Sequence, residues 1–356
     1  MTYHILAINP GSTSTKTAFY ENEQERWRES LEHSRQELEA YERIVDQHHM
    51  RKESILLLLE KHKISLNTLS AVVGRGGLLP LVRSGAYEVN DIMVERLCTN
   101  PVAEHASNLG AMIARDIAGP LDIPAYIYDA VSVDELQEVA RISGWPELPR
   151  KSLIHALNMR AAALKTARHL EKPYDELRLI VVHLGGGITM SVHAGGKMID
   201  VLSDDEGPFS PERTGRVPCI ALAKLCFSGQ YTEREILQML RGKGGLIAYL
   251  GTDKVTELET MVQANQRDAI LLFDALAYQI AKGIGELSIV LRGQIDRIVL
   301  TGGMAYSEKL TQTITEQVQF LAPVEILPGE NELEALALGT LRVLRGKELA
   351  YEYFED

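Results

Sequence analysis

Three apolar runs along the chain each end in a turn that contains glycine. They lie at residues 5–17, 179–189 and 298–304, with the sequences ILAINPGSTSTKT, LIVVHLGGGIT and IVLTGGM. Aliphatic and β-branched residues bounded by glycine are typical of a buried strand. Glycine and hydroxyl groups at its end let backbone N–H groups approach a ligand, and oriented N–H groups bind phosphate. An early, a central and a late turn therefore predict one nucleotide held between two related halves.

Strands and helices are expected to alternate through the first half of the chain. Short apolar runs predict strands at 5–10, 16–20, 71–73 and 124–129. Apolar residues at helical spacing predict helices at about 43–61, 101–117 and 153–169. The strand at 71–73 stops at Gly74-Arg-Gly-Gly77, and the strand at 124–129 ends on Asp129.

The order of strand, glycine turn and strand then restarts at Leu179. Further strands are expected at 179–184, 188–193, 198–202, 296–300 and 323–328, and helices at about 267–291 and 331–344. This pattern predicts an α/β fold with a weak repeat of topology. The 356 residues suggest two domains. We expect residues 1–170, completed by a C-terminal helix at 331–350, to form one and residues 171–330 the other.

Composition excludes several classes of function. The net charge of −12 argues against nucleic-acid binding, which needs clusters of basic residues. The three cysteines, Cys98, Cys219 and Cys226, form no CxxC pair, so neither a disulfide framework nor a zinc site is expected. The aliphatic run at 55–59 is too short to cross a bilayer, and no signal peptide is seen. A cytoplasmic location, with no membrane partner, is therefore expected.

The motifs that surround the three turns occur in a specific order along the chain. They are Asn9-x-Gly-Ser-x-Ser14, Gly74-Arg-Gly-Gly77, Asp129, His155, His183-Leu-Gly-Gly-Gly187, Thr301-Gly-Gly303 and Asn331-Glu332. Together they resemble the acetate and butyrate kinase family over essentially the whole chain. The chain length, the Gly74–Gly77 turn and the HLGGG sequence are most similar to the butyrate or branched-chain carboxylate kinase branch.

The resemblance implies a fold, a reaction and a set of ligands. The fold would be that of actin and the sugar kinases, with two domains and a nucleotide cleft between them. The reaction would be reversible phosphoryl transfer between ATP and butyrate or a similar short-chain fatty acid, which gives an acyl phosphate and ADP. The family also implies Mg²⁺ and homo-oligomers.

The first turn is the predicted phosphate and metal loop. The resemblance places Asn9, Gly11, Ser12, Ser14 and Lys16 near the phosphates. Lys16-Thr17 is not part of a P-loop, because that motif would need glycine at positions 10 and 15, which are Pro10 and Thr15. The alternative is an ordinary Asn-Pro-Gly turn of a hairpin.

The second turn, Gly185-Gly186-Gly187, is the predicted site of transfer. The resemblance places His155, His183 and Arg213 around the transferred phosphoryl group, whose charge spreads over three oxygens in the transition state. A histidine on an apolar strand is otherwise a core residue with satisfied hydrogen bonds. Arg216 is the near alternative to Arg213, and either arginine could instead pair with the acidic residues at 204–206. His105, on an expected helix, fits either a functional or a structural role.

Oxygen-bearing side chains supply the predicted metal site. The resemblance assigns Mg²⁺ to Asp129, Glu332 and Asn9, and Mg²⁺ is usually held by one or two carboxylates with phosphates and water. Asp129 is also a catalytic candidate, since it could instead orient the attacking carboxylate. Glu332 could instead be a favourable charge in the first turn of a helix. Arg75 could bind the substrate carboxylate bidentately. The family arginine lies three residues earlier, where this chain has Val72, so Arg75 would act from a shifted position.

The third turn, with Gly302 and Gly303, is assigned to adenosine. Gly244, Gly245 and the stretch to Asp253 are assigned with it, and Asp253 is a candidate for the ribose. A carboxylate acceptor is already ionised at pH 7, so direct in-line transfer needs no general base. Two rivals remain open. One is another kinase, such as a sugar kinase, or a polyphosphate or nucleotide phosphohydrolase of this fold; the other is a non-catalytic, nucleotide-dependent structural ATPase.

Overall fold

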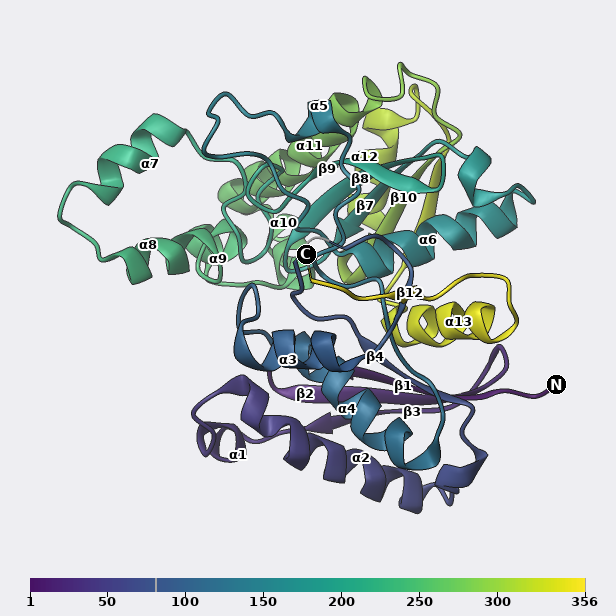
Figure 1. Ribbon diagram of the computed structural model, residues 1–356. Helices are drawn as coiled ribbons and strands as arrows, with labels where there is room; N and C mark the ends of the chain where they lie inside the picture. Colours follow the sequence, from purple (N-terminus) through teal and green to yellow (C-terminus); the bar gives the residue numbers. More distant parts are fainter. Residues whose placement is uncertain (81, 356) are drawn as a thin grey trace. The chain divides into compact units, whose positions relative to one another are not determined.

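The computed structural model describes residues 1–80 and 82–355 and is an α/β protein with two mixed sheets (Figure 1). The chain divides into two compact units, residues 1–134 with 331–356 and residues 135–330. The sequence placed this boundary near residue 170. The intervening segment carries helix α6 (Ala156–His169), which packs on strands β7 (Leu179–Leu184) and β10 (Arg297–Gly302) of the second unit.

The first unit contains a seven-stranded sheet in the order β12-β5-β6-β4-β1-β2-β3. Its strands are β1 (His4–Pro10), β2 (Ser14–Glu21), β3 (Gln24–Glu32), β4 (Ala71–Arg75), β5 (Ala86–Glu88), β6 (Ala125–Tyr128) and β12 (Tyr351–Glu352). Strands β1, β4 and β6 run parallel, so their carboxyl ends meet at one edge. In α/β sheets such an edge is where ligands bind.

Helices cover both faces of this sheet. The helices of this unit are α1 (Arg35–Glu39), α2 (His48–Lys61), α3 (Asp91–Thr99), α4 (Leu109–Ala118) and α13 (Glu332–Leu344), whereas α5 (Glu138–Arg141) belongs to the second unit. Helix α4, backed by α2, packs on the face with Leu6, Ile8 and Val72. Helix α13 contacts β1, β4 and β6 from the opposite face, where its Gly339 lies against the ring of Tyr128.

The second unit contains a five-stranded sheet in the order β11-β10-β7-β8-β9. Its further strands are β8 (Ile188–Ala194), β9 (Lys197–Leu202) and β11 (Val324–Pro328). Both sheets share one arrangement of five strands, in the orders β6-β4-β1-β2-β3 and β11-β10-β7-β8-β9. In each, three consecutive strands form an antiparallel meander, and two later strands lie parallel to the first strand of that meander. The structure thus shows the topological repeat that the glycine turns suggested.

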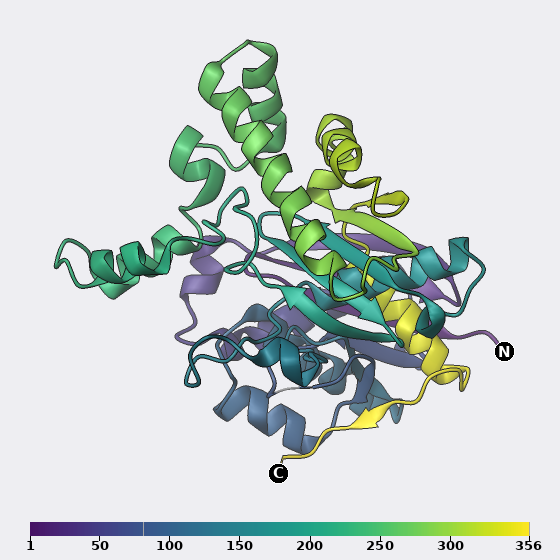
Figure 2. The same ribbon diagram turned by 90° about the horizontal axis from the view of Figure 1, so that it is seen from above.

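The two faces of the second sheet differ in polarity. The other helices of this unit are α7 (Cys219–Cys226), α8 (Glu233–Leu240), α9 (Gly245–Leu250), α10 (Val255–Gln263), α11 (Arg267–Ser288) and α12 (Glu308–Val318). The long helix α11, green in Figure 2, packs on the apolar face of β7, β8 and β9. Helix α6 covers the other face, on which Thr189, Ser191 and His193 alternate along β8 and are all buried.

Two helices of the first unit differ from what the sequence predicted. The helix expected from Pro101 begins at Leu109, after a 3₁₀ turn at Ala106–Asn108. Its apolar spacing starts only at Ala106, and the preceding residues from 102 to 104 are exposed. Helix α3 was not expected, although Asn90 caps it by accepting the N–H of Met93 at 2.9 Å. Its short buried side consists of Met93 and Leu97, too few residues to show a periodic pattern.

Buried His193 predicts a loss of stability at acidic pH. Its Nδ1 lies 2.7 Å from the Tyr174 hydroxyl and its Nε2 2.7 Å from Ser191 Oγ. Burial, followed by the charge of Arg160, lowers the pKa of His193 to about 3. Below pH ~6.5 the unfolded chain takes up a proton that the folded chain does not, so stability falls as the pH drops from there toward 3. Between pH 7 and 5 this loss is about 2 kcal/mol.

Urea unfolding at pH 7 and pH 5 measures this effect, with His193→Gln as the comparison. The variant is expected to be less stable at pH 7 because it loses buried hydrogen bonds, but to change less between the two pH values. Equal pH dependence in the two proteins would contradict the assignment.

Candidate active-site residues

Asn9, Arg75 and Glu332 form one cluster at the carboxyl edge of the first sheet. Strands β1 and β4 pair with Ile8 opposite Gly74, so Asn9 and Arg75 follow as neighbours. The Asn9 amide donates a hydrogen bond to Glu332, the first residue of α13. The Arg75 guanidinium lies 3.1 Å from the Glu332 carboxylate and 3.5 Å from the side-chain oxygen Oδ1 of Asn9. The fold thus joins three predicted site residues that are far apart in sequence.

Arg75 therefore pairs with the predicted metal-site acid in this structure. Glu332 also lies in the first turn of α13, where a negative charge is favourable, so the two interpretations of this residue are compatible. His105 lies close enough for the charge of Arg75 to act on it. Burial first, and then Arg75, lowers the pKa of His105, whose Nδ1 accepts the N–H of Ser107 at 3.1 Å. His105 caps a 3₁₀ turn and does not lie on a helix as expected.

Asp129 follows β6 at the same edge of the sheet. The preceding residue, Tyr128, is paired with Arg75, which places Asp129 beside the cluster in the strand order. Asp129 has φ = 41°, and its buried carboxylate accepts the N–H of Gly85 at 2.8 Å. A left-handed conformation in a residue other than glycine costs on the order of 1 kcal/mol. The carboxylates of Asp129 and Glu332 and the amide oxygen of Asn9 are a donor set that fits Mg²⁺.

The first turn is supported from inside the unit by an arginine that sequence reasoning missed. The turn closes with a 2.7 Å hydrogen bond from Gly11 N–H to Ser14 O, and Lys16 pairs across the hairpin with Asn9. Arg51 of α2 is fully buried and donates hydrogen bonds to this turn. A signal was present, because Arg51 shares the helical spacing of the buried residues Ile55 and Leu58.

The two predicted histidines of the second unit stack on each other. The rings of His155 and His183 have centroids 3.8 Å apart and planes inclined by 12°. His183 lies on β7 and faces α6, whereas His155 is the residue just before α6 begins. His155 Nδ1 is 2.9 Å from the hydroxyl of Thr189 on β8. Two protonated rings in this stack would repel each other, so the arrangement favours at most one positive charge.

Asn158 fixes the proton position of His183. The Asn158 amide nitrogen lies 2.9 Å from His183 Nδ1, and an amide NH₂ group can only donate. The neutral ring therefore carries its proton on Nε2. A Cβ atom placed on Gly185 would lie 2.7 Å from this Nε2 atom, so a glycine is needed for the turn to pass so close. The imidazole N–H thus lies directly beside the Gly185–Gly187 turn.

Arg213 reaches the same turn from a different segment. Ser210 Oγ donates to Gly186 O at 2.6 Å, and Glu212 N–H donates to the same oxygen at 3.3 Å. A Cβ atom on Gly187 would lie 2.4 Å from Arg213 Nη1, so the guanidinium packs directly on that glycine. The structure therefore places both Arg213 and the His183 N–H against the second glycine turn.

A buried aspartate joins Arg213 to a second arginine that sequence reasoning missed. The side chain of Asp204 is 3% exposed and lies 2.5 Å from Arg213 and 2.7 Å from Arg241, with one oxygen facing each guanidinium. The expected alternative, an ion pair of Arg213 with the 204–206 segment, is thus present. With two arginines on one carboxylate, this group keeps a net positive charge. Arg216 instead contacts Glu206 O at 2.8 Å and Glu286 at 2.9 Å and is largely exposed.

The residues assigned to adenosine lie in separate parts of the second unit. Gly302 ends β10 and Gly303 begins a 3₁₀ turn at Gly303–Tyr306. Gly244 donates its N–H to Glu212 O at 3.2 Å, so it lies against the Arg213 segment. Asp253 is exposed in the loop before α10. The hydrogen bond of Gly244 thus gives the start of the 244–253 stretch a structural role beside Arg213. The assignment of this stretch to adenosine stays a prediction.

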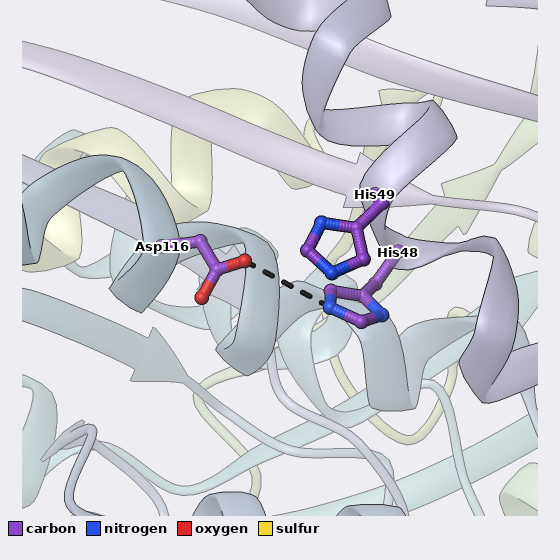
Figure 3. A group of neighbouring side chains, drawn as sticks. All are labelled: His48, His49 and Asp116. Carbon is purple, nitrogen blue, oxygen red and sulfur yellow. Dashed lines mark ion pairs between the residues drawn. The ribbon is translucent and has the colours of Figure 1, made fainter.

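A second group of possible metal ligands lies away from these clusters. His48 and His49 on α2 and Asp116 on α4 bring their ligand atoms within 4.8 Å of one another (Figure 3). His48 Nε2 and Lys52 Nζ each lie 3.8 Å from Asp116 Oδ2. Because the Lys52 ammonium already neutralises the carboxylate that a metal would need, we interpret this group as ion pairs that join α2 to α4.

Comparisons with known proteins agree with this fold. The acetokinase family profile matches residues 150–335. Butyrate kinase 2 of Clostridium acetobutylicum is 49% identical over 355 residues, which cover 99% of this chain and 100% of that protein. Within the described residues, no helix is both long and apolar enough to span a bilayer.

Solved structures show the same fold at low sequence identity. The acetate kinase of Porphyromonas gingivalis superimposes with a TM-score of 0.80 at 18% identity, covering 96% of this chain and 100% of that one. A propionate kinase from Francisella tularensis superimposes with a TM-score of 0.74 at 17% identity, covering 94% and 98%. From the family profile and the full-length identity, this chain belongs to the acetokinase family.

Proposed function

We propose that the chain is a carboxylate kinase that reversibly transfers the γ-phosphoryl group of ATP to butyrate or a similar short-chain carboxylate. Full-length identity of 49% to butyrate kinase 2 supports this substrate class. The structural observation that carries the proposal is that the Arg213 guanidinium and the side chain of His183 lie against one triglycine turn. A guanidinium and an imidazole N–H beside one glycine turn suit a phosphoryl group in transfer.

Direct in-line attack by the carboxylate fits these residues best. The carboxylate is ionised at pH 7 and attacks the γ-phosphorus, and the bond from phosphorus to the β–γ bridging oxygen breaks to release ADP. No protein nucleophile and no general base is required. Arg213 would neutralise the charge on the equatorial oxygens, and the Nε2–H of His183 would donate to one of them. His155, stacked on His183, would hold that ring in place.

The residues of the first unit would bind the metal and the acid. Asp129, Glu332 and Asn9 would hold Mg²⁺, which supplies charge neutralisation on the ATP phosphates when bound. Arg75 is a less direct carboxylate ligand than expected, because it already contacts Glu332. We assign Arg75 the role of holding Glu332 in place. A substrate carboxylate would compete with Glu332 for Arg75, and the metal would compete with Arg75 for Glu332.

Initial rates over acetate, propionate, butyrate, isobutyrate and valerate test the proposal. Hydroxylamine traps the acyl phosphate as a hydroxamate, so transfer is separated from ATP hydrolysis. Burial of one CH₂ group contributes about 0.8 kcal/mol, or roughly a fourfold change in kcat/KM, so butyrate, with two more CH₂ groups, is expected to exceed acetate by about fifteenfold. ATP hydrolysis without hydroxamate, or a kinetically competent phosphoenzyme, would rule out the proposed reaction.

A further inference from the structure

Arg51 binds the first turn from its buried side. It lies on α2, is 0% exposed, and donates from Nη1 to Gly11 O at 2.8 Å and to Ser14 O at 3.1 Å. Nη2 donates to Ser12 O at 3.2 Å. The two remaining bonds run from Nη1 to the Thr15 hydroxyl at 3.2 Å and from Nη2 to Gln47 Oε1 at 2.8 Å. Four of these five contacts are thus with residues of one short turn.

These contacts fix the direction in which the turn presents its N–H groups. A trans peptide is planar, with its C=O and the following N–H pointing in opposite directions. Because the carbonyls of Gly11 and Ser12 point to Arg51, the N–H groups of Ser12 and Thr13 point away from it. Across residues 1–80 and 82–355, neither N–H donates a hydrogen bond. Consecutive N–H groups aimed outward form the kind of concavity that binds anions.

Arg51 also places a positive charge behind these donors. All five of its acceptors are neutral, and it forms no ion pair with an acid in the part of the chain that is described. Burial lowers the pKa of Arg51 to about 10, so it stays charged at neutral pH. A buried charge that lacks a counter-ion is unfavourable, and an anion bound on the other side of the turn would relieve this cost.

The neighbouring histidine is neutral, so Arg51 supplies the charge of this network. The Thr15 hydroxyl accepts from Arg51 and lies 2.8 Å from Nε2 of His33, to which it can donate only if that nitrogen is unprotonated. Burial, followed by the charge of Arg51, lowers the pKa of His33. This hydrogen-bonded network therefore carries one positive charge, on the Arg51 guanidinium that contacts the turn. Its members are Gln47, Arg51, Thr15 and His33.

We propose that Arg51 is a positioning residue for nucleotide binding, which turns the Ser12 and Thr13 N–H groups outward and serves as the counter-charge of a phosphate bound to them. This deepens the proposed kinase function and rests on it for the identity of the anion, the phosphate chain of ATP or ADP. Arg51 is not expected to act on the acyl substrate, because its hydrogen bonds are confined to this turn and to Gln47.

Arg51→Lys is the main test, with nucleotide binding measured by calorimetry and KM measured for each substrate. Lysine keeps the charge but cannot bridge three carbonyls, so the variant is expected to fold and to bind ADP and MgATP at least about tenfold more weakly. KM for butyrate is expected to stay within about threefold, a split that a general loss of structure would not produce. Arg115→Lys is the matched control, because Arg115 lies on α4 and pairs with exposed Asp91.

Chemical rescue of Arg51→Ala provides a second test, which does not depend on the folding of Arg51→Lys. In Arg51→Ala, guanidinium at millimolar concentration is expected to restore nucleotide affinity, and ammonium at the same concentration is expected to restore less. Unchanged nucleotide affinity in Arg51→Lys, or equal changes in both KM values, would overturn the inference. Nucleotide binding that depends on Arg51 without any acyl transfer would instead refute the proposed reaction and leave this inference standing.

Discussion

Replacing Arg213 by alanine is expected to lower kcat for acyl-phosphate formation by about 10²- to 10³-fold, because a fixed cation at the transferred group stabilises charge that develops in the transition state. The protein is expected to stay folded. Asp204, which loses Arg213, keeps its 2.7 Å contact with Arg241 and is not left as an isolated buried charge. Hydroxamate formation measures kcat, and circular dichroism checks the fold.

Two further variants test whether the effect on kcat is specific to the Arg213 guanidinium and its position on the turn. Arg216→Ala removes an arginine three residues away whose partners are Glu206 and Glu286, and near-normal activity is expected. Gly187→Ala keeps Arg213 but forces its guanidinium off the turn, since the new Cβ would lie 2.4 Å from Nη1. It is expected to reduce kcat at least tenfold. Full activity in both Arg213→Ala and Gly187→Ala would exclude a catalytic role for Arg213.

Replacing His183 by alanine is expected to lower kcat by about 10²-fold with a smaller change in KM for ATP, because it removes one oriented N–H donor. The surface residue His169, which lies 2.6 Å from Glu325, is the control, and His169→Ala is expected to act as the parent protein. The rates are measured by the same hydroxamate assay. A His183→Ala protein with the parent kcat would show that His183 is a core histidine alone.

Asn158 allows the donor function of His183 to be tested without removing the ring. Asn158→Asp replaces the amide donor by a carboxylate acceptor, which favours the proton on Nδ1 and not on Nε2. The ring then turns a lone pair toward Gly185. We expect kcat to fall about tenfold or more while the protein stays folded. An active variant would mean that the Nε2 proton has no role in transfer.

The sequence revealed the elements whose signals are local. Strands β1, β7 and β10 are continuous apolar runs, and each stops at glycine, so both their positions and their turns were predictable. Strand β3 and helix α7 were not expected, because β3 is mostly exposed and α7 has no buried residue. Strand β3 alternates half-buried with exposed positions from Trp27 onward, but only Trp27 and Leu31 of its half-buried residues are apolar, so its apolar pattern is short.

Contacts that depend on tertiary structure were beyond the sequence. The hydrogen bond from Asn9 to Glu332 joins residues 323 positions apart, and the ion pair of Arg241 with Asp204 joins two loops. The resemblance indicated Asn9 and Glu332 separately, but nothing indicated that Arg75 would contact both of them. Arg51 was missed for a different reason: its spacing with Ile55 and Leu58 placed it on the buried side of α2, but an arginine in a helix is usually solvated.

The first unit is formed from both ends of the chain, and this has a consequence for synthesis on the ribosome. Residues 1–134 emerge first, but helix α13 and Glu332 emerge only after all 196 residues from 135 to 330 have been made. The second unit is contiguous and can complete its core while the first still lacks one face of its sheet. Domains fold as units during synthesis, so the Asn9–Arg75–Glu332 cluster assembles last. An incomplete chain would therefore carry the second unit's phosphoryl-binding groups without the acid that completes the first.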